Sequence, residues 1–412
     1  MIPGYRDRMT TPTLPALPTV IEGSRLPILS WATDAEETAF AQARNLANLE
    51  VARHHIALMP DAHSGFGMPI GGVLLTEAAV VPYAIGVDIG CGVQIAETNL
   101  VWGDNFDPEK LRNVLRQIQR DIPTGFSSHK SPVMTRDRLL DVMGMDLPGK
   151  RSVFPAAFDG ALNQVGTLGG GNHFLEVQRD PDTNRVYFML HSGSRSLGKK
   201  LCDVHAKVAL EWCNANRHPL PDKDLAWLPL DTIEGAAYWD AMTFALRWAE
   251  INRRVMMDAV ERAFRKHASV HRFERLVDVH HNYAAHEQHA GVDGILHRKG
   301  AVRAAAGDLV LIPGSMGTAS YMGEGLGSAA SFETCQHGAG RVLGRNAAKR
   351  LKPSSDVFAE MAEWGIEFIS NEPKTAAEEA AFAYKDIDAV MAASADLVRP
   401  IRRLVPLGVV KG

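Results

Sequence analysis

Five short strings, four of which contain glycine, each carry a polar or ionisable side chain directly after an apolar run. Glycine allows positive φ angles and close approach of the backbone to a ligand, and the end of a strand holds a side chain in a fixed place. Together the strings provide one thiol, one carboxylate and several imidazoles. This mixed donor set suits Zn²⁺ or Mn²⁺, and a carboxylate or thiolate within it can bridge two ions. The strings are VDIGCG (87–92), GGGNHF (169–174), LHSGSR (190–195), HHNY (280–283) and QHGAGR (336–341).

Each of these side chains also has an ordinary structural interpretation. A histidine at the end of a strand is commonly a hydrogen-bonded structural residue, Asp88 can form an Asx turn, and Cys91 can be a small buried apolar residue. The conjunction of thiol, carboxylate and imidazoles favours a metal site over these separate explanations. The four cysteines form no CxxC pair, so the sequence offers neither a disulfide framework nor a zinc ribbon.

Two strings are rich in glycine and serine but poor in charge, namely GTLGGGNHFLE (166–176) and LIPGSMGTASY (311–321). Backbone N–H groups in such turns can bind phosphate or a nucleobase, or the strings can simply be tight turns. The glycine-rich lysine loop of a Walker-type nucleotide site is absent from the sequence. His337 lies on a glycine loop near Arg341. A neutral imidazole there can attack phosphorus while the guanidinium neutralises the phosphate.

The elements that must position these strings alternate irregularly between helix and strand. Helical periodicity covers residues 34–53, and residues 107–122 form a second helix with Asp107 as its N-cap. Two long helical stretches within residues 197–270 indicate a hairpin or insertion, and the last segment is predicted as a helix, a short strand and a tail. Because there is no regular βαβ alternation, we expect an α+β fold. It would be a single compact domain of residues 1–412 with mixed sheets and the helical excursion at 197–270.

The composition excludes several classes of protein. Hydrophobic residues make up 46% and charged residues 22% of the 412 residues, so the chain can bury a core and is not globally disordered. A formal charge of −4 excludes a strongly basic protein held to nucleic acid by bulk charge, but leaves room for a local basic channel. No run approaches the roughly 18 apolar residues of a membrane span, and the N-terminal segment lacks the apolar core of a signal peptide. We therefore expect a cytoplasmic protein with no membrane partner.

The ordered strings resemble those of the RtcB family of RNA ligases. VDIGCG, GGGNHF, HSGSR, HHNY, RKGA, PGSMG, HGAGR, AYKDID and the final KG occur in the order seen in that family, and the resemblance extends from PDAHSGFG at Pro60 to Gly412. The resemblance implies a GTP- and Mn²⁺-dependent ligase. Such an enzyme joins an RNA 3′-phosphate or 2′,3′-cyclic phosphate end to a 5′-hydroxyl end, in tRNA splicing or RNA repair. A guanylylated histidine and an RNA(3′)pp(5′)G intermediate are implied as well, and archease is a candidate activating partner.

By motif, the resemblance assigns two Mn²⁺ ions to five side chains, of which Cys91 would bridge both ions. The five are Asp88, Cys91, His173, His191 and His281. His337 would be the nucleophile that becomes guanylylated. The residues that would bind GTP are Asn172, Glu176, Pro313, Gly314, Ser315, Met316, Ser320, His337, Gly338, Ala339, Gly340 and Lys411.

The sequence departs from the family pattern at three places. Phe66 stands where many members carry Lys or Tyr, Gly344 stands where Ser is usual, and AYKDID lacks a preceding Pro. No departure removes a proposed ligand, but Gly344 lies near the nucleotide loop and bears on phosphate binding or on the preferred RNA end. Asp61 and His63 occupy another glycine turn, where they are either active-site residues that orient His337 or structural residues.

Two other functions fit parts of the pattern. A metal-dependent phosphoesterase, or an RNA-processing paralogue with a different substrate, would keep the metal site but would not become guanylylated. A non-catalytic RNA-binding module would bind RNA without Cys91 or His337, although the presence of every proposed metal ligand argues against it. Labelling with GTP that is radioactive at the α-phosphate separates the ligase from the phosphoesterase.

Overall fold

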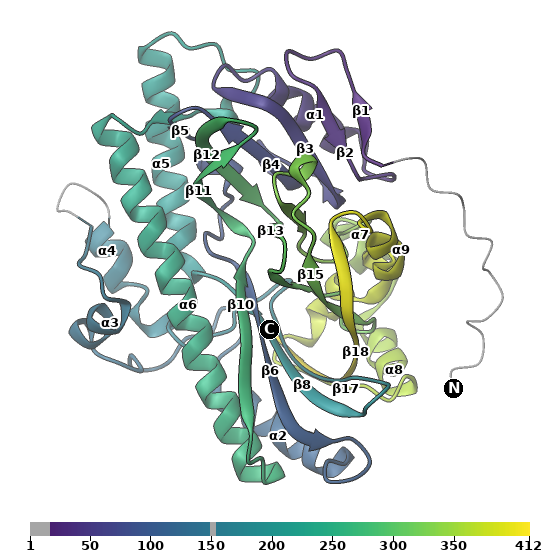
Figure 1. The fold of residues 1–412 in the computed structure, drawn as a ribbon. Coiled ribbons are helices and arrows are strands. Elements are labelled where there is room, and N and C mark those ends of the chain that lie inside the picture. The colour runs from purple at the N-terminus through teal and green to yellow at the C-terminus, as the bar shows by residue number, and fades with distance from the viewer. Residues whose placement is uncertain (1–16, 149–153) are drawn as a thin grey trace.

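The computed structural model describes residues 17–148 and 154–412, and a mixed sheet in this part of the chain carries most of the glycine-rich strings (Figure 1). We call this eight-stranded sheet the large sheet. Its strands are β6 (Gly92–Val101), β7 (Phe174–Arg179), β8 (Arg185–Ser192), β10 (Phe273–His280), β14 (Leu309–Ile312), β15 (Ser320–Gly325), β17 (Glu367–Ser370) and β18 (Val398–Lys411). They follow the order β10-β6-β8-β7-β18-β15-β14, with β17 pairing in parallel with the end of β18.

The register of the large sheet brings three of the strings to one end. Gly92 pairs with Ser192 on β8 and with His280 on β10, while His191 pairs with Phe174 on β7. Side chains at paired positions of neighbouring strands lie within contact distance. The segments that precede β6 and β7 and follow β8 and β10 therefore meet at this end of the sheet.

A six-stranded sheet, the small sheet, lies beside the large one. Its strands are β1 (Thr19–Ile21), β2 (Ile28–Ser30), β3 (Ala52–His63), β4 (Ile70–Thr76), β11 (Asn282–His289) and β12 (Val292–Lys299). They follow the order β1-β2-β3-β4-β12-β11. The chain crosses from the large sheet to the small one between β10 and β11, where His281 alone separates the two strands. Two short pairs of strands lie outside these sheets: β5 (Ala79–Val80) with β9 (Leu228–Pro229), and β13 (Ala301–Arg303) with β16 (Thr334–Gln336).

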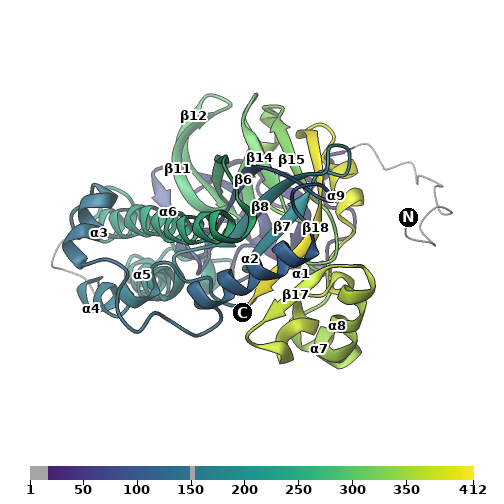
Figure 2. The ribbon, with the colours of Figure 1, turned by 90° about the horizontal axis from the view of Figure 1, so that it is seen from below.

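Helices pack around the sheets, and two of them, α2 and α6, lie along one side of the large sheet (Figure 2). The α-helices are α1 (Glu37–Ala47), α2 (Pro108–Asp121), α3 (Arg136–Met143), α4 (Phe154–Asp159), α5 (Arg195–Ala215), α6 (Ile233–Ala268), α7 (Arg345–Leu351), α8 (Ser354–Glu363) and α9 (Ile387–Ala393). Short 3-10 turns occupy Pro82–Ala84, Leu162–Gln164, Lys223–Leu225, Ala329–Ser331, Pro373–Glu379 and Ala381–Ala383.

The predicted helical hairpin exists as α5 and α6, but it is part of the core rather than an excursion from it. The 36-residue α6 buries Trp248 in one apolar cluster with Phe158, and buries Phe264 in another with Phe188 of β8. Each such ring contributes roughly 1.5–3 kcal/mol of burial free energy. The helix therefore joins the large sheet to the N-terminal half of the chain in one compact domain, which confirms the α+β class.

Other predicted helices and strands exist, but the limits of some of them differ from the prediction. Asp107 caps α2, because its Oδ1 accepts the N–H of Lys110 at 2.9 Å. The helix predicted at 34–53 is too long: α1 ends at Ala47 and the chain has turned into β3 by Ala52. The short strand and tail predicted at the C-terminus are also wrong, since β18 is 14 residues long and reaches Lys411.

The predicted domain limits, residues 1–412, include segments outside the described residues. Within residues 17–148 and 154–412, no helix is both long enough and apolar enough to span a bilayer.

Candidate active site

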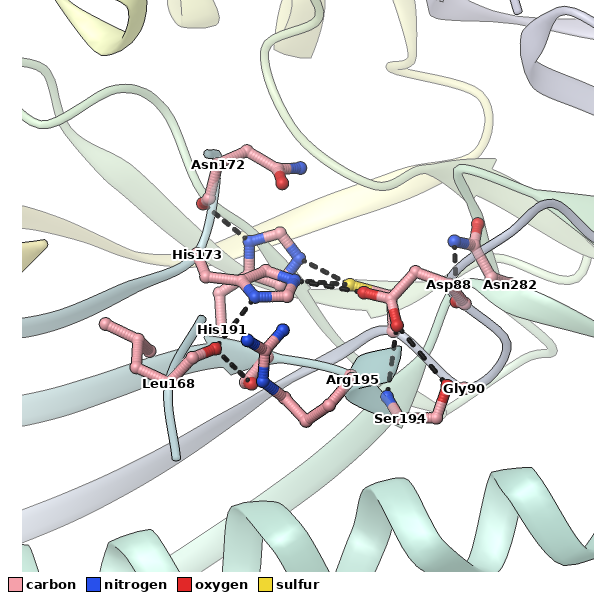
Figure 3. Close-up of polar contacts among 12 residues, drawn as sticks. Asp88, Gly90, Leu168, Asn172, His173, His191, Ser194, Arg195 and Asn282 are labelled. Carbon is pink, nitrogen blue, oxygen red and sulfur yellow. Dashed lines mark hydrogen bonds and ion pairs between the residues drawn. The ribbon is translucent and has the colours of Figure 1, made fainter. Parts of the chain in front are cut away.

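A thiol and two imidazoles converge at the end of the large sheet where the strings meet (Figure 3). The Sγ atom of Cys91 lies 3.4 Å from Nε2 of His173 and 3.2 Å from Nε2 of His191. One potential ligand atom from each residue lies within 4.8 Å of those of the other two, and all three residues are buried. The three side chains are therefore spaced as ligands of a common metal centre.

Asp88 and His281 extend this cluster in two directions. Oδ2 of Asp88 lies 3.1 Å from Nε2 of His173, and Nε2 of His281 lies 3.3 Å from Nε2 of His191. Cys91 contacts both His173 and His191, so its sulfur lies between the two pairs. The structure thus brings all five predicted metal ligands together around the sulfur of Cys91.

The hydrogen bonds of the imidazoles leave their Nε2 atoms free to bind a metal. Nδ1 of His173 donates to the carbonyl of Leu168 at 2.8 Å, and Nδ1 of His191 donates to the carbonyl of Asn172 at 3.1 Å. Such outer hydrogen bonds fix the tautomer that presents Nε2 to a metal. Burial lowers the pKa of His191 and His281 well below the ordinary histidine value, which keeps both rings neutral.

Several lone pairs therefore face one another in a buried space. Burial raises the pKa of the Cys91 thiol well above its usual range, so without a metal it keeps its proton. That single hydrogen can satisfy only one of the two imidazole nitrogens that contact the sulfur. Nδ1 of His281 is buried without a hydrogen-bond partner. A cation among these donors would replace the missing hydrogens, so the residues fit a metal centre.

The carboxylate of Asp88 is fixed by the turn that follows β8. Its Oδ1 accepts the N–H of Ser194 at 3.1 Å and the hydroxyl of Ser194 at 3.3 Å. A Cβ at Gly193 would collide with this carboxylate, which explains the glycine at that position. Burial alone would raise the pKa of Asp88, but the hydrogen bond and charge of His173, with the charge of Arg195, lower it to about 2. The carboxyl group of Asp88 is therefore ionised, which is the form in which a carboxylate binds a metal.

A cavity of about 150 Å³ opens beside the cluster. His191 belongs to both, because it contacts Cys91 and also lines the cavity. All of the residues predicted to bind GTP line this one cavity: Asn172, Glu176, Pro313, Gly314, Ser315, Met316, Ser320, His337, Gly338, Ala339, Gly340 and Lys411.

His337 occupies the wall between the cavity and the metal cluster. Its ring centroid lies 4.9 Å from that of His281. Oδ2 of the fully buried Asp61 accepts the backbone N–H of His337 at 3.2 Å and lies 2.6 Å from its Nδ1, although that second contact is not aligned as a hydrogen bond. Nε2 is thus the ring nitrogen left to react. His63 lines the same cavity, so Asp61 and His63 belong to the site, but both lie at the end of strand β3 and not in a glycine turn as predicted.

The cavity also contains a buried carboxylic acid, Glu176. Burial raises the pKa of Glu176 to about 8, while the hydrogen bond from Gln178 and the charge of Lys411 act in the opposite direction. Nε2 of Gln178 donates to Oε1 of Glu176 at 2.5 Å and to Oγ of Ser320 at 2.9 Å. Glu176 is therefore held in a fixed position and is protonated near neutral pH, which gives the cavity a neutral hydrogen-bonding group.

Sequence reasoning missed a charged cluster that holds the terminal lysine in the cavity. Nζ of Lys411 lies 3.5 Å from Oε2 of the buried Glu379, and Nη1 of Arg341 lies 3.3 Å from Oε1. The Tyr384 hydroxyl donates to the same carboxylate, and Nε of Arg345 lies 3.5 Å from it. Glu379, Tyr384, Arg341 and Arg345 all line the cavity. Tyr384 lies in the AYKDID string, but nothing nearby in the sequence marks Glu379.

Arg253 was missed as well, although it supports the segments that carry predicted metal ligands. This fully buried side chain of α6 donates through Nη1 to the carbonyls of Gly90 at 2.8 Å and Ser192 at 2.9 Å. Its Nε forms a 2.7 Å ion pair with Asp278. Arg253 thus fixes the residues next to Cys91 and His191. In the sequence it lies in a helical run among other arginines, without a glycine turn to signal its position.

Two of the departures from the family pattern, Phe66 and Gly344, lie at exposed positions. Phe66 is 67% exposed. Gly344 directly precedes α7. Its φ of −63° is unstrained for any residue, and a Cβ there would meet nothing within 4 Å. A serine would fit at this position, so the glycine removes a possible capping side chain without changing the backbone. The next residue, Arg345, lines the cavity.

Comparison with known proteins agrees with the geometry. A family model described as tRNA-splicing ligase RtcB matches residues 42–147 and 143–412. The chain is 36% identical to the RNA-splicing ligase RtcB of Escherichia coli over 411 residues, covering 94% of this chain and 97% of the relative. It is 35% identical to the RNA-splicing ligase RtcB of Mycobacterium tuberculosis (90% and 100% covered) and 32% identical to the tRNA-splicing ligase RtcB of Methanococcus maripaludis (92% of each covered). The chain therefore belongs to the RtcB family.

Proposed function

We propose that this protein is a GTP- and Mn²⁺-dependent RNA ligase that joins RNA 3′-phosphate or 2′,3′-cyclic phosphate ends to 5′-hydroxyl ends. The observation that carries the proposal is the position of His337. It lines the cavity with the other predicted GTP-binding residues, and its ring lies 4.9 Å from that of His281 in the metal cluster. A nucleophile for GTP and a cation site for its phosphates are thus adjacent.

His337 would react through Nε2, because Nδ1 faces the carboxylate of Asp61. The Nε2 lone pair attacks the α-phosphorus of GTP, a P–N bond forms, and the bond to the oxygen of the β-phosphate breaks, so that pyrophosphate leaves. The imidazole becomes positively charged as it attacks. Asp61 favours the tautomer with its proton on Nδ1 and stabilises that charge.

Two further transfers complete the ligation. An oxygen of the RNA 3′-phosphate attacks the phosphorus bound to His337, the P–N bond breaks, and the RNA(3′)pp(5′)G end forms. The 5′-hydroxyl of the second RNA end then attacks the RNA 3′-phosphorus, GMP leaves, and a phosphodiester bond remains. Arg341 and Arg345 line the cavity and supply positive charge for phosphate oxygens.

Asp88, Cys91, His173, His191 and His281 would hold the Mn²⁺ ions. Bound there, the ions would supply Lewis-acid stabilisation of negative charge on phosphate oxygens. The choice of Mn²⁺ rests on the family resemblance, because the mixed donor set also suits Zn²⁺. Archease as an activating partner rests on the same resemblance.

The test combines GTP labelling with ligation. The wild-type protein is incubated with Mn²⁺ and GTP radioactive at the α-phosphate, and separately with a defined pair of RNA ends. We expect an acid-labile, base-stable label on the protein and a joined RNA. Hydrolysis of the cyclic phosphate without any protein label would favour a metal-dependent phosphoesterase instead.

A further inference from the structure

One aromatic ring near the site is almost completely exposed. Phe126 is 99% exposed, the highest value among the exposed large apolar side chains of the described residues. A ring of this size usually buries much of its surface in a core or an interface. Its exposure near a proposed RNA-joining site therefore indicates a surface that contacts a ligand. It lies in the segment that follows α2.

The turn that carries Phe126 is held firmly from both sides. The N–H of Ser127 donates to the carbonyl of Thr124 at 3.1 Å, and the N–H of Gly125 donates to the carbonyl of Gly169 at 2.8 Å. Gly125 adopts a left-handed φ of +63°, and Nδ2 of Asn371 donates to Oγ1 of Thr124 at 2.8 Å. The exposed ring therefore projects from an ordered backbone.

The same turn is connected to the metal cluster through two hydrogen bonds. The N–H of Leu168 donates to the carbonyl of Pro123 at 2.9 Å, and the carbonyl of Leu168 accepts from Nδ1 of His173 at 2.8 Å. Figure 3 shows Leu168 and His173 together with Arg195 on this side of the cluster. The position of Phe126 is thus fixed relative to a predicted metal ligand.

A cation lies directly behind the turn. Nη2 of Arg195 donates to the carbonyl of Gly125 at 3.4 Å, and Nε donates to Oγ1 of Thr167 at 3.3 Å. These two bonds fix the guanidinium between the turn and the metal cluster, where its charge also acts on the carboxylate of Asp88. An exposed aromatic ring on an ordered turn is a surface on which a base of single-stranded nucleic acid can stack.

We infer that Phe126 stacks on a nucleobase of the single-stranded RNA whose end is brought to the metal cluster. This inference rests on the proposed function and deepens it, because it names a contact that positions the RNA rather than the GTP. Phe126 is a positioning residue: it orders the strand near the reacting end.

The test measures RNA binding without GTP, so that no ligation occurs. Fluorescence anisotropy follows two labelled ten-nucleotide RNAs, one with a 3′-phosphate and one with a 5′-hydroxyl. Phe126→Ala should weaken binding of at least one of them by about five- to one-hundred-fold, as expected for the loss of one stacked base. Phe126→Trp should restore it. The melting temperature of Phe126→Ala should equal that of the wild type, because the ring has almost no buried contacts to lose.

Ile233→Ala is the matched control. Ile233 is also an exposed large apolar residue, at 68%. It begins α6, 20 residues before Arg253 and so about 30 Å from it along the helix axis. We expect this variant to bind both RNAs as the wild type does. In addition, an RNA that is abasic at the stacked position should bind wild-type protein and Phe126→Ala equally.

The outcomes separate the stacking contact from the proposed function. Wild-type affinity of Phe126→Ala for both RNAs would overturn the inference. GMP attachment to the wild-type protein, which needs no RNA, is measured in parallel. RNA binding that depends on Phe126, in a protein that neither takes up GMP nor ligates, would refute the proposed function alone. Failure of the wild-type protein to bind either RNA would refute both.

Discussion

The imidazole of His281 lies against that of His337, with ring centroids 4.9 Å apart and planes inclined by 57°. His281 also contacts His191 of the metal cluster through Nε2 atoms 3.3 Å apart, while His337 faces Asp61 on its other side. The cluster of predicted metal ligands thus adjoins the cavity lined by His337 at this pair of rings. These two residues have different proposed roles, so substitutions can separate metal binding from guanylylation.

His337→Ala should abolish covalent attachment of GMP while leaving the metal content unchanged. His337 is the proposed nucleophile, and its ring is outside the set of donors around Cys91. The measurement is radioactive label on the denatured protein, with metal per chain determined on the same sample. His271→Ala, which alters an exposed histidine outside the cavity, should label normally. Label on His337→Ala would identify another residue as the nucleophile.

Cys91→Ala should lose metal and ligase activity together. The sulfur contacts both His173 and His191, so its removal affects both halves of the cluster. Metal per chain after dialysis is the measurement. Cys213→Ala removes another buried thiol, which contacts the carbonyl of Trp227 rather than an imidazole. It should cost roughly 1 kcal/mol of stability and retain the metal. Full occupancy of Cys91→Ala by two ions would make this cysteine a structural residue.

Lys411→Met should reduce GTP use and also lower stability by about 1–3 kcal/mol. The ammonium group lines the cavity and lies 3.5 Å from the buried carboxylate of Glu379. Glu379 keeps Arg341 and Arg345 as partners, which limits the loss. The rate of GMP attachment against GTP concentration and urea unfolding measure the two effects.

The double variant Lys411→Met with Glu379→Gln is the control for this pair. In Lys411→Met, the buried carboxylate of Glu379 has lost one of its cationic partners. Glu379→Gln removes that negative charge, so the double variant should recover part of the stability without recovering GTP use. A Lys411→Met protein with wild-type GTP dependence would show that the lysine serves the fold alone.

Glu176→Gln should change the pH dependence of stability. Burial raises the pKa of Glu176 from 4.5 to about 8. Between these values the unfolded chain loses the proton while the folded protein keeps it, so this group's contribution to stability falls as pH rises through that range. The glutamine variant lacks this loss.

Its unfolding free energy relative to wild type should therefore increase with pH, by up to about 1.4 kcal/mol per pH unit. Urea unfolding of both proteins at several pH values between those two pKa values, without nucleotide, makes the comparison. Parallel pH profiles would show that Glu176 is ionised in the folded protein.

The sequence predicts the site residues better than their supports, for a physical reason. Asp88 and Cys91 lie in a glycine turn and His191 lies at the end of β8, next to Gly193, so glycines adjacent to these residues mark the need for close backbone approach. Arg253 acts through hydrogen bonds to Gly90 and Ser192, which are 163 and 61 positions away in the chain. Such a contact follows from the packing of α6 on the large sheet and leaves no local signal.

The errors in the element limits have local causes. At the end of α1 the helical periodicity continues past Ala47, although the chain turns there and enters β3. The C-terminal strand was underestimated because Pro400 and Pro406 and the intervening charges are atypical of a strand interior. In the structure, the pairing of β18 with β7 shifts register between Pro406 and Gly408, which accommodates the second proline within the strand.

The crossing of the chain at His281 gives the metal cluster a mechanical role. Cys91, His173 and His191 lie at the ends of large-sheet strands, whereas His281 is the residue at which the chain passes into the small sheet. Ions bound to all of these side chains would clamp the two sheets together in the manner of a cross-link. Because a ligand that binds only the folded state stabilises it by mass action, removal of metal should loosen this junction first. Amide hydrogen exchange around β10 and β11 should then accelerate before the rest of the large sheet opens.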